Sequence, residues 1–386
     1  SNLQRLRWVE FTGKEDASHT SITFDADQLT CQGNGHPVDK DGWTRLSFIM
    51  GAGNLAPRKH QRIGVKNHGL KVCFTVGDDI NVRSNGKFIN QTLYKDSINQ
   101  LPSPGAYAHP LSDETAPNKG CLIEVPYRCK KLTVNIGEPL EFAPTSAEMI
   151  ERLFLKACRE VPQRFIGALR PHTRQRYVID LSHHRLGTVR FEFSCGRERP
   201  FRRSKLYNRT CRISGNVQEL PHELNESCCL FAVPLPKGSN REIPEFYSAR
   251  EGFFLAEIAW KTQGSGRPVS SFGRRRYPIA YGGTDQSAFT GVGLHFSGTY
   301  ISDLERHGAS DATAFNDYID NACRSMLVTI LRYKLIPQHG VKVMNLLMMD
   351  PENPDEDNLR KLVEQLLEAG AFPLSQRVAN VNNHLL

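Results

Sequence analysis

The amino-acid sequence predicts an α+β protein with two domains and a C-terminal helical tail. Three observations predict this class. The chain has 386 residues, more than one ordinary domain of about 100 to 200 residues contains. Strand-like segments occur in both halves, and helical spacing follows them in each half. We therefore expect domains over residues 1–172 and 173–345 and a helical tail over residues 346–386.

Three segments of the first half are expected to form strands. Residues 21–38 alternate between apolar and polar and then reach a turn. Residues 72–84 have the pattern of two strands that bend at Gly77 and Asp78. Residues 120–128 have the pattern of a further strand. These segments predict a small sheet in the first domain.

A helix and a long loop complete the first half. The helix is expected over residues 145–158, with Thr145 or Ser146 as its cap. Its apolar stripe consists of Ile150, Leu153, Phe154 and Ala157. Residues 88–119 contain Pro, Gly, Ser and Asp without periodicity. Because a loop of that length inside a domain is usually functional or disordered, we expect a lid there.

The second half contains strand-like segments followed by helices. The segments cover residues 176–184, 187–195, 227–236, 252–262 and 291–302. A long helix is expected over residues 311–336, with an apolar face made of Phe315, Tyr318, Ile319, Ala322, Met326 and Ile330. After Pro351 the charged residues predict an amphipathic helix with an acidic first turn and Gly370 as its stop.

Composition limits the setting and the partners. The chain has 49 Lys and Arg against 41 Asp and Glu, so its formal charge of +8 permits an acidic partner such as nucleic acid. Its ten cysteines never form a C-x-x-C pair, which disfavours a zinc ribbon. No signal-peptide pattern and no apolar run near the roughly 18 residues of a membrane span occur. We expect an intracellular protein, cytoplasmic or nuclear, without a membrane partner.

A glycine-bracketed turn is the first candidate site. Gly64 and Gly69 can take positive φ or allow a ligand close to the backbone, and Asn67 tolerates the left-handed conformation. The amides of such a turn can point at an anion, which is the chemistry of a phosphate cradle. A turn of this composition before a strand is more often only a turn.

The order of several motifs resembles that of the GHKL ATPases, the superfamily of gyrase, MutL, MORC proteins, heat-shock chaperones and histidine kinases. The motifs are Asn2, "GNGHPV" (33–38), "GVKNHGLK" (64–71), "VGDDINVRSNGK" (76–87) and "KGCLIEV" (119–125). The resemblance covers about residues 1–130. It implies a GHKL, or Bergerat-type, α/β sandwich, followed by a transducer-like α+β domain and the C-terminal helix.

The resemblance implies a binding site for ATP and magnesium. Asn2 matches the family's magnesium-binding Asn, and the Glu that serves as general base lies four residues earlier, upstream of Ser1. The phosphate-binding stretch matches Gly64, Lys66, Asn67, His68, Gly69, Leu70 and Lys71. Lys71 is expected at a helix start, where backbone amides and a lysine can hold a triphosphate.

On the adenine side the family has an Asp-x-Gly-x-Gly strand end and a Gly-Thr pair. Two registers match the first motif: one puts Cys31 at the Asp position, and the other puts Gly33 there, followed by Asn34 and Gly35. We prefer the second register because it keeps apolar residues inward at period two. The Gly-Thr pair becomes Gly120 and Cys121. Neither register supplies a carboxylate for the adenine amine.

Two basic segments are candidates for nucleic-acid contact. They contain Arg199, Arg202 and Arg203, and Arg274, Arg275 and Arg276, and a solvated loop is an equally weighted interpretation of each. His183 and His184 end a strand without ligand-spaced neighbours, so packing is favoured over metal binding.

These features lead to a prediction of function with alternatives. We expect a dimerising ATPase that acts on nucleic acid or within a larger complex, in which ATP orders residues 88–119 or 51–63 as a lid. One alternative is a degenerate GHKL scaffold that no longer turns over ATP, which the missing adenine carboxylate favours. Another is a chaperone-like ATPase that acts on protein clients.

Overall fold

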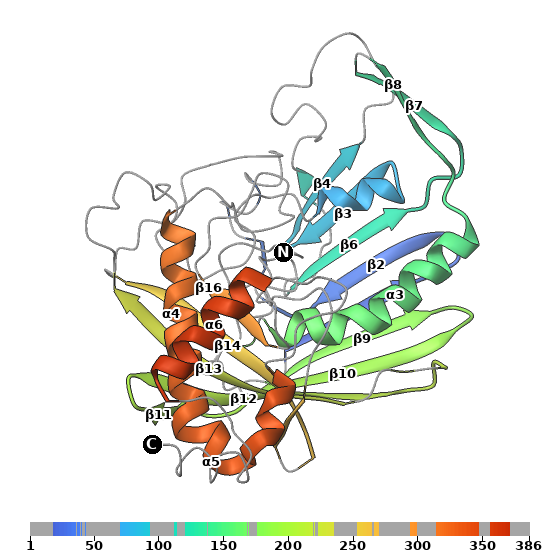
Figure 1. Cartoon of the computed structure of the whole chain (residues 1–386). Coiled ribbons are helices and arrows are strands. Elements are labelled where there is room, and N and C mark those ends of the chain that lie inside the picture. The colour runs from blue at the N-terminus through green and yellow to red at the C-terminus, as the bar shows by residue number, and fades with distance from the viewer. Residues whose placement is uncertain are drawn as a thin grey trace, which may run out of the picture.

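The structure is a computed structural model that describes part of the chain. The described residues are 18–35, 37, 38, 40, 43, 70–92, 112–113, 120–136, 138–167, 169, 176–218, 220, 223–234, 253–264, 266–269, 294–298, 314–346 and 356–370. The chain is a mixed α+β protein with one large sheet and few helices, as the sequence predicts at the level of class (Figure 1).

All described strands except the hairpin of β7 and β8 belong to the large sheet. Its order is β15-β14-β13-β12-β10-β9-β1-β2-β6-β3-β4-β5, with β11 beside β12 and β16 beside β14. The strands of the first half are β1 (Ser18–Phe24), β2 (Gln28–Gly33), β3 (Asp79–Ser84), β4 (Lys87–Thr92), β5 (Ser112–Asp113) and β6 (Cys121–Pro126), with β7 (Leu132–Ile136) and β8 (Glu138–Phe142) apart.

The second half continues the same sheet. Its strands are β9 (Tyr177–His183), β10 (Gly187–Cys195), β11 (Arg199–Phe201), β12 (Ser204–Gly215), β13 (Leu224–Pro234), β14 (Phe253–Gln263), β15 (Arg267–Val269) and β16 (His295–Gly298). β1 and β9 pair in parallel, whereas the other described pairs are antiparallel. The sheet therefore passes without a break through the predicted boundary between residues 172 and 173, and that division of the chain stays a prediction.

Helix α3 (Ala147–Ile166) covers the middle of the sheet. It begins where predicted, because the Ser146 hydroxyl accepts a hydrogen bond from the Met149 amide at 3.1 Å. Ile150 and Phe154, from the predicted stripe, are buried in a core shared with strands of both halves. The helix packs on β9, β10 and β12 and thus ties the two halves of the chain together (Figure 1).

A second core lies on the opposite face of the sheet, under helix α4 (Ala314–Ile330). Consecutive residues of a strand point to opposite faces, and Cys228 of β13 belongs to the core under α3, while Cys229 belongs to the core under α4. Phe315, Ile319 and Ile330 fill this second core, as predicted for the long helix. Each helix therefore supplies its own hydrophobic layer.

The predicted helix of residues 311–336 changes geometry near its end. α4 leads into a π-helical turn, Leu331–Leu335, then α5 (Ile336–His339) and a 3-10 helix, Gly340–Leu346. Pro337 lies just after the π turn. Proline lacks an amide hydrogen and its ring clashes with the carbonyl four residues earlier, so a widened turn before it relieves the clash.

The last described helix, α6 (Glu356–Glu368), packs on α4. Its Leu366 is fully buried in the second core, and Arg332 donates to the Ala369 carbonyl at 2.9 Å. Gly370 follows with φ of +59°, as expected for the predicted stop. Figure 1 shows α4, α5 and α6 gathered near the β11 and β12 end of the sheet, away from β7 and β8. None of the helices among the described residues combines the length and apolar character of a membrane span.

Three predicted segments are wrong in detail. Residues 71–75 form a 3-10 helix, not the first of two strands, and only Asp79–Ser84 is a strand. Residues 88–92 lie in β4 and residues 112–113 in β5, so these parts of the predicted lid are strands, and residues 93–111 and 114–119 lie outside the described residues. The strand over Ser204–Gly215 was not predicted, because its charged residues hide the alternation.

Candidate functional site

The predicted adenine side lies on the sheet face that α3 covers. The strand registers align Thr20 of β1, Gly33 of β2 and Cys121 of β6, and the neighbouring register places Ser84 of β3 beside Cys121. These small side chains form a row across four strands. The adjacent row consists of larger residues, Ile22, Cys31, Ile123 and Val82. The row that contains Gly33 therefore has smaller side chains than the adjacent row.

Gly33 and Gly120 approach each other closely between β2 and β6, in the middle of this row. Gly120 has φ of +78°, and a Cβ atom added to it would lie 1.8 Å from the Gly33 carbonyl oxygen. The Ser84 hydroxyl donates to the Gly120 carbonyl at 2.5 Å and accepts from the Val38 amide at 2.9 Å. The site therefore requires glycine at position 120 for two separate reasons, conformation and space.

Asn34 and Gly35 follow β2 in the predicted motif. The Asn34 amide donates to the His19 carbonyl at 3.1 Å, and the His19 amide donates to the Asn34 side-chain oxygen at 2.8 Å. This pair of bonds holds the end of β2 against β1. Asn34 therefore fixes the strand end, and nothing in these bonds assigns it a ligand.

Thiols occupy the positions where the resemblance expects polar groups. Burial, with smaller contributions from the neighbouring Cys121 and Cys73, raises the pKa of Cys31 to about 12. Burial likewise raises the pKa of Cys73 to about 11. Both thiols therefore stay protonated near neutral pH. A protonated thiol is a weak hydrogen-bonding group and cannot replace the acceptor strength of a carboxylate.

The structure does not separate the two registers of the adenine motif. Cys31 and Gly33 are two residues apart, so both point to the face under α3. The period-two argument for Gly33 therefore applies to Cys31 equally. By the register of their strands, Glu124 of β6, Asp79 of β3 and Asp180 of β9 point to the other face.

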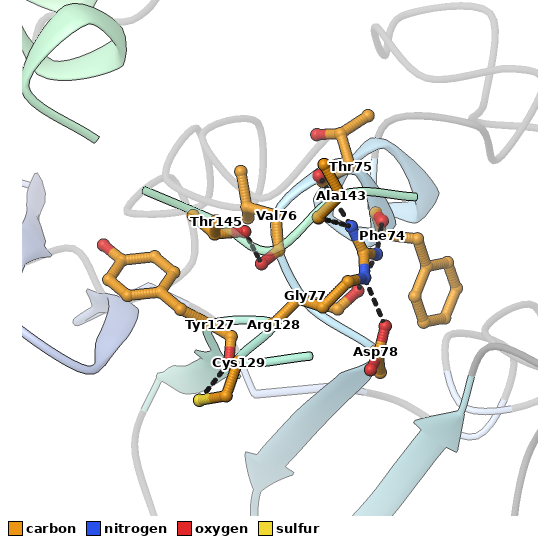
Figure 2. A network of polar contacts seen from close by, with 10 residues as sticks. All are labelled: Phe74, Thr75, Val76, Gly77, Asp78, Tyr127, Arg128, Cys129, Ala143 and Thr145. Carbon is orange, nitrogen blue, oxygen red and sulfur yellow. Dashed lines mark hydrogen bonds and ion pairs between the residues drawn. The ribbon is translucent and has the colours of Figure 1, made fainter. Parts of the chain in front are cut away.

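A buried arginine that the sequence did not reveal organises the segment beside the predicted phosphate turn. Arg128 is 3% exposed. Its Nε donates to Asp78 at 2.6 Å, and one Nη donates to the Phe74 carbonyl at 2.6 Å (Figure 2). Further bonds of 3.3 Å reach the carbonyls of Thr75, Gly77 and Ala143. The guanidinium thus satisfies carbonyls that the end of a helix leaves unpaired.

The same segment is held from a second direction. Thr145 donates its hydroxyl to the Val76 carbonyl at 2.6 Å, next to the cap of α3, and the Arg128 amide donates to the same carbonyl at 2.9 Å (Figure 2). Gly77 lies so close to the Pro126 carbonyl that an added Cβ would be 2.4 Å from its oxygen. Residues 74–78 therefore have a rigid position relative to β6 and α3.

Most of the predicted phosphate and magnesium contacts lie outside the described residues. This group comprises Asn2, Gly64, Lys66, Asn67, His68 and Gly69. Leu70 is buried, and the backbone of Lys71 begins the 3-10 helix that Arg128 holds at its other end. A helix start at Lys71 agrees with the prediction.

At the base end of the predicted site, one polar group is available to a ligand. The Thr20 hydroxyl is buried, and within the described residues it has no hydrogen-bond partner. It could therefore bond one edge of a base, beside the neutral thiols. The carboxylate contact of the family is missing from this face. We therefore assign no role to magnesium beyond the predicted contact with Asn2.

The first basic segment forms a hairpin, not a loop. Arg199 lies in β11, and Arg202 has φ of +50° in the turn between β11 and β12. The Arg202 guanidinium lies 3.4 Å from the ring centroid of Tyr333, so it stacks on the π turn after α4. Arg203 is exposed. Arg274, Arg275 and Arg276 lie outside the described residues.

A cavity of about 380 Å³ lies beside this hairpin. Its lining includes Arg197, Arg199, Lys334 and His339, together with the neutral polar side chains of Asn208, Ser227 and Gln338. The sequence indicated the arginines because several of them occur within residues 196–205. It could not indicate Lys334 and His339, which are about 130 residues further along the chain.

His183 has a packing role. It is buried, its ring stacks on His184 with centroids 4.6 Å apart, and its Nδ1 accepts from the amides of Arg185 and Leu186. Among the described residues, no group of three or more His, Cys, Asp or Glu side chains could hold a metal ion.

Comparison with known proteins adds no family. No protein-family model matches the chain, and no curated protein matches it significantly.

Proposed function

We propose that the chain is a GHKL-type ATP-binding module that changes its association state with nucleotide. The close approach of Gly33 and Gly120 carries the proposal. It supports a site in which backbone, not side chains, forms the edge of the ligand surface at the ends of β2 and β6. The resemblance implies a nucleotide as the ligand of such a surface.

In this proposal the base lies over Thr20, Gly33 and Cys121, and the phosphates lie toward the start of the 3-10 helix at Lys71. Arg128 acts as a positioning residue, because it holds the end of that helix against β6 and α3. The predicted phosphate-binding stretch of residues 64–69 precedes this helix in the sequence and lies outside the described residues. Ordering of a lid by ATP then completes a dimer contact in an intracellular complex.

The described residues supply no general base for hydrolysis. Asp78 accepts a hydrogen bond from Arg128 at 2.6 Å and forms an ion pair with it, so it is not free to act as a base. The neutral thiol of Cys31, which occupies the Asp position in one register, favours a second candidate, a GHKL-like scaffold that binds nucleotide without turnover.

Nucleotide titration tests the proposal. The chain is titrated with ATP, GTP and their non-hydrolysable analogues in a calorimeter. We expect binding of both bases with little discrimination, because a site without a buried partner for the exocyclic amine of adenine cannot penalise its absence. No binding of any nucleotide would contradict the proposal.

Introducing the family's Asp at each of its two candidate positions tests both the nucleotide site and the register of the adenine motif. Cys31→Asp and Gly33→Asp are compared with Cys31→Asn and Gly33→Asn as neutral controls of equal size. A carboxylate accepts from the adenine amine and repels the guanine oxygen at the same position. A charged hydrogen bond of about 1.5 to 3 kcal/mol corresponds to roughly 10- to 100-fold preference for ATP. The position that produces this preference is the Asp position of the motif.

Alanine substitution of two glycines distinguishes the effect of close backbone approach from the effect of a positive φ. Gly120→Ala and Gly86→Ala both place a side chain at positive φ, +78° and +69°, but only the first meets backbone within 4 Å. We expect Gly120→Ala to abolish nucleotide binding and Gly86→Ala to preserve it, with circular dichroism to verify folding. Equal affinity in two folded variants would remove the Gly33–Gly120 edge from the proposal.

A further inference from the structure

The basic cavity beside the β11 hairpin lies on the sheet face away from the proposed nucleotide site. Asn208, Ser227 and Trp260 are aligned across β12, β13 and β14, so they form one wall of the cavity. Lys334, Leu335, Gln338 and His339 from the π turn and α5 form the facing wall. We propose that this cavity binds a phosphate group of a single-stranded nucleic acid.

The lining carries positive charge without compensation. Neither Asp nor Glu is among the residues that line the cavity. In the part of the chain that the structure describes, Arg197, Arg199 and Lys334 form no ion pair. The adjacent carboxylate, Glu198, is bound by Lys205 at 2.7 Å and so is not directed at these arginines. Three side chains that are cationic at neutral pH therefore surround a space that an anion would fill.

The pKa of His339 is lowered in part by the same positive charges. Burial lowers the pKa of His339, and the nearby positive charges of Lys334 and Lys342 lower it further. A carboxylate close to the ring would act in the opposite direction. The groups that face the ring thus disfavour one more positive charge, and a bound anion would reverse this effect.

The positive surface extends beyond the cavity, which indicates a chain of phosphates and not a single ion. Arg202 stacks on Tyr333, whose ring also lies 5.3 Å from the Arg332 guanidinium. Arg203 and Lys342 are exposed. These cations lie on the hairpin and on the helical segment that flank the opening. A polyanion would contact several of them while one phosphate occupies the cavity.

The shape of the site favours an unpaired strand. Cavities of about 300 to 1,000 Å³ hold small ligands, and this one is at the lower end of that range. A duplex presents its phosphates on a wide, rigid surface, whereas a single strand can direct one phosphate or one nucleotide into a concave site. The proposal is independent of nucleotide binding, since the cavity belongs to the part of the fold under α4.

Charge reversal tests the proposal. A fluorescein-labelled oligothymidylate of about 16 nucleotides is titrated with the full chain, and anisotropy is followed between about 50 and 200 mM salt. Arg199→Glu and Lys334→Glu, singly and together, are compared with Lys130→Glu. Lys130 is an exposed control near β7 that carries the same charge change. We expect about tenfold weaker binding for each cavity variant, a smaller salt dependence, and unchanged binding for the control.

A second measurement is needed because reversal of Lys334 could affect folding. In the wild-type chain with labelled histidine, the pKa of His339 is measured by NMR with and without the oligonucleotide. Bound phosphate should raise this pKa, and oligonucleotide variants without thymine should have the same effect. Absence of binding at low salt, equal loss in Lys130→Glu, or an unchanged His339 would overturn the proposal. So would tighter binding to duplex DNA or to vesicles of anionic lipid.

Discussion

Two buried arginines hold this fold together in different ways. Arg128 follows β6 and is surrounded by main-chain carbonyls and one carboxylate, that of Asp78. Arg209, in the middle of the sheet, is fully buried and lies between two carboxylates, with 2.9 Å to Glu257 and 3.2 Å to Glu226. Arg128 thus mainly positions backbone segments through its hydrogen bonds, and Arg209 neutralises two buried carboxylates.

The surroundings of Arg209 explain why it stays charged. Burial acts to lower its pKa, but Cys228, Glu257 and Glu226 act in the opposite direction and raise the pKa well above its usual value. Tyr207 donates to the second oxygen of Glu257 at 2.5 Å. Arg209 also donates to the Gly167 carbonyl at the end of α3. The cluster therefore joins a helix of the first half to strands of the second half.

The comparison teaches that an arginine can be buried for its shape or for its charge. The planar guanidinium of Arg128 donates to several carbonyls in fixed directions, and a lysine ammonium cannot reproduce this set of bonds. Carboxylates around Arg209 require a positive charge, and their own burial is costly without one. Substitutions that separate shape from charge should therefore affect the two sites differently.

The largest effect is expected from removal of the charge at position 209. Arg209→Met should lower the free energy of unfolding by about 3 to 5 kcal/mol, because two carboxylates remain buried without a cation. Urea denaturation measures the change. The variant Arg209→Met with Glu226→Gln and Glu257→Gln should recover part of the loss. If the triple variant were no more stable than the single one, charge balance would not be the reason for the cluster.

A smaller effect is expected at position 128, and lysine substitution distinguishes the two sites. Arg128→Met should cost about 1 to 3 kcal/mol through lost hydrogen bonds to carbonyls. Arg128→Lys should remain close to Arg128→Met, whereas Arg209→Lys should recover more than half of the loss in Arg209→Met. Hydrogen exchange of the amides in residues 71–79 should be faster in both Arg128 variants. Full rescue by lysine at position 128 would show that charge matters there too.

The smallest effect concerns His183, a buried base that no strong partner keeps charged. Burial lowers the pKa of His183, and the charge of His184 lowers it further, while Glu151 opposes them. The folded state therefore disfavours the proton, so stability is fully present above the ordinary histidine pKa of about 6.5 and falls as pH drops toward the lowered pKa.

Substitution of His183 tests this pH dependence. His183→Asn should keep an acceptor for the amides of Arg185 and Leu186 and should reduce the slope of stability between pH 6.5 and lower values, by at most about 1.4 kcal/mol per pH unit. Unfolding midpoints in urea at several pH values measure the slope. Because the pKa of His339 is lowered as well, a residual slope is expected in the variant. An unchanged slope would contradict the assignment to His183.

The sequence by itself determined the elements whose signals are local. β10 coincides with the alternating segment 187–195, α3 begins after its capping serine, and α6 ends before Gly370. These features depend on neighbours within a few residues, which the sequence lists in order. The strand signals around Gly33 and Cys121 are local as well, and these two residues end β2 and begin β6.

The tertiary structure alone decided which distant groups meet. The apolar residues after Leu70 are compatible with a strand, but Arg128, more than fifty residues away, captures the carbonyls of Phe74 and Thr75 and stabilises a 3-10 helix instead. The parallel pairing of β1 with β9 and the meeting of Arg199 with Lys334 around one cavity are of the same kind. No local pattern encodes them, because a buried donor pairs with whichever carbonyl the rest of the fold leaves unsatisfied beside it.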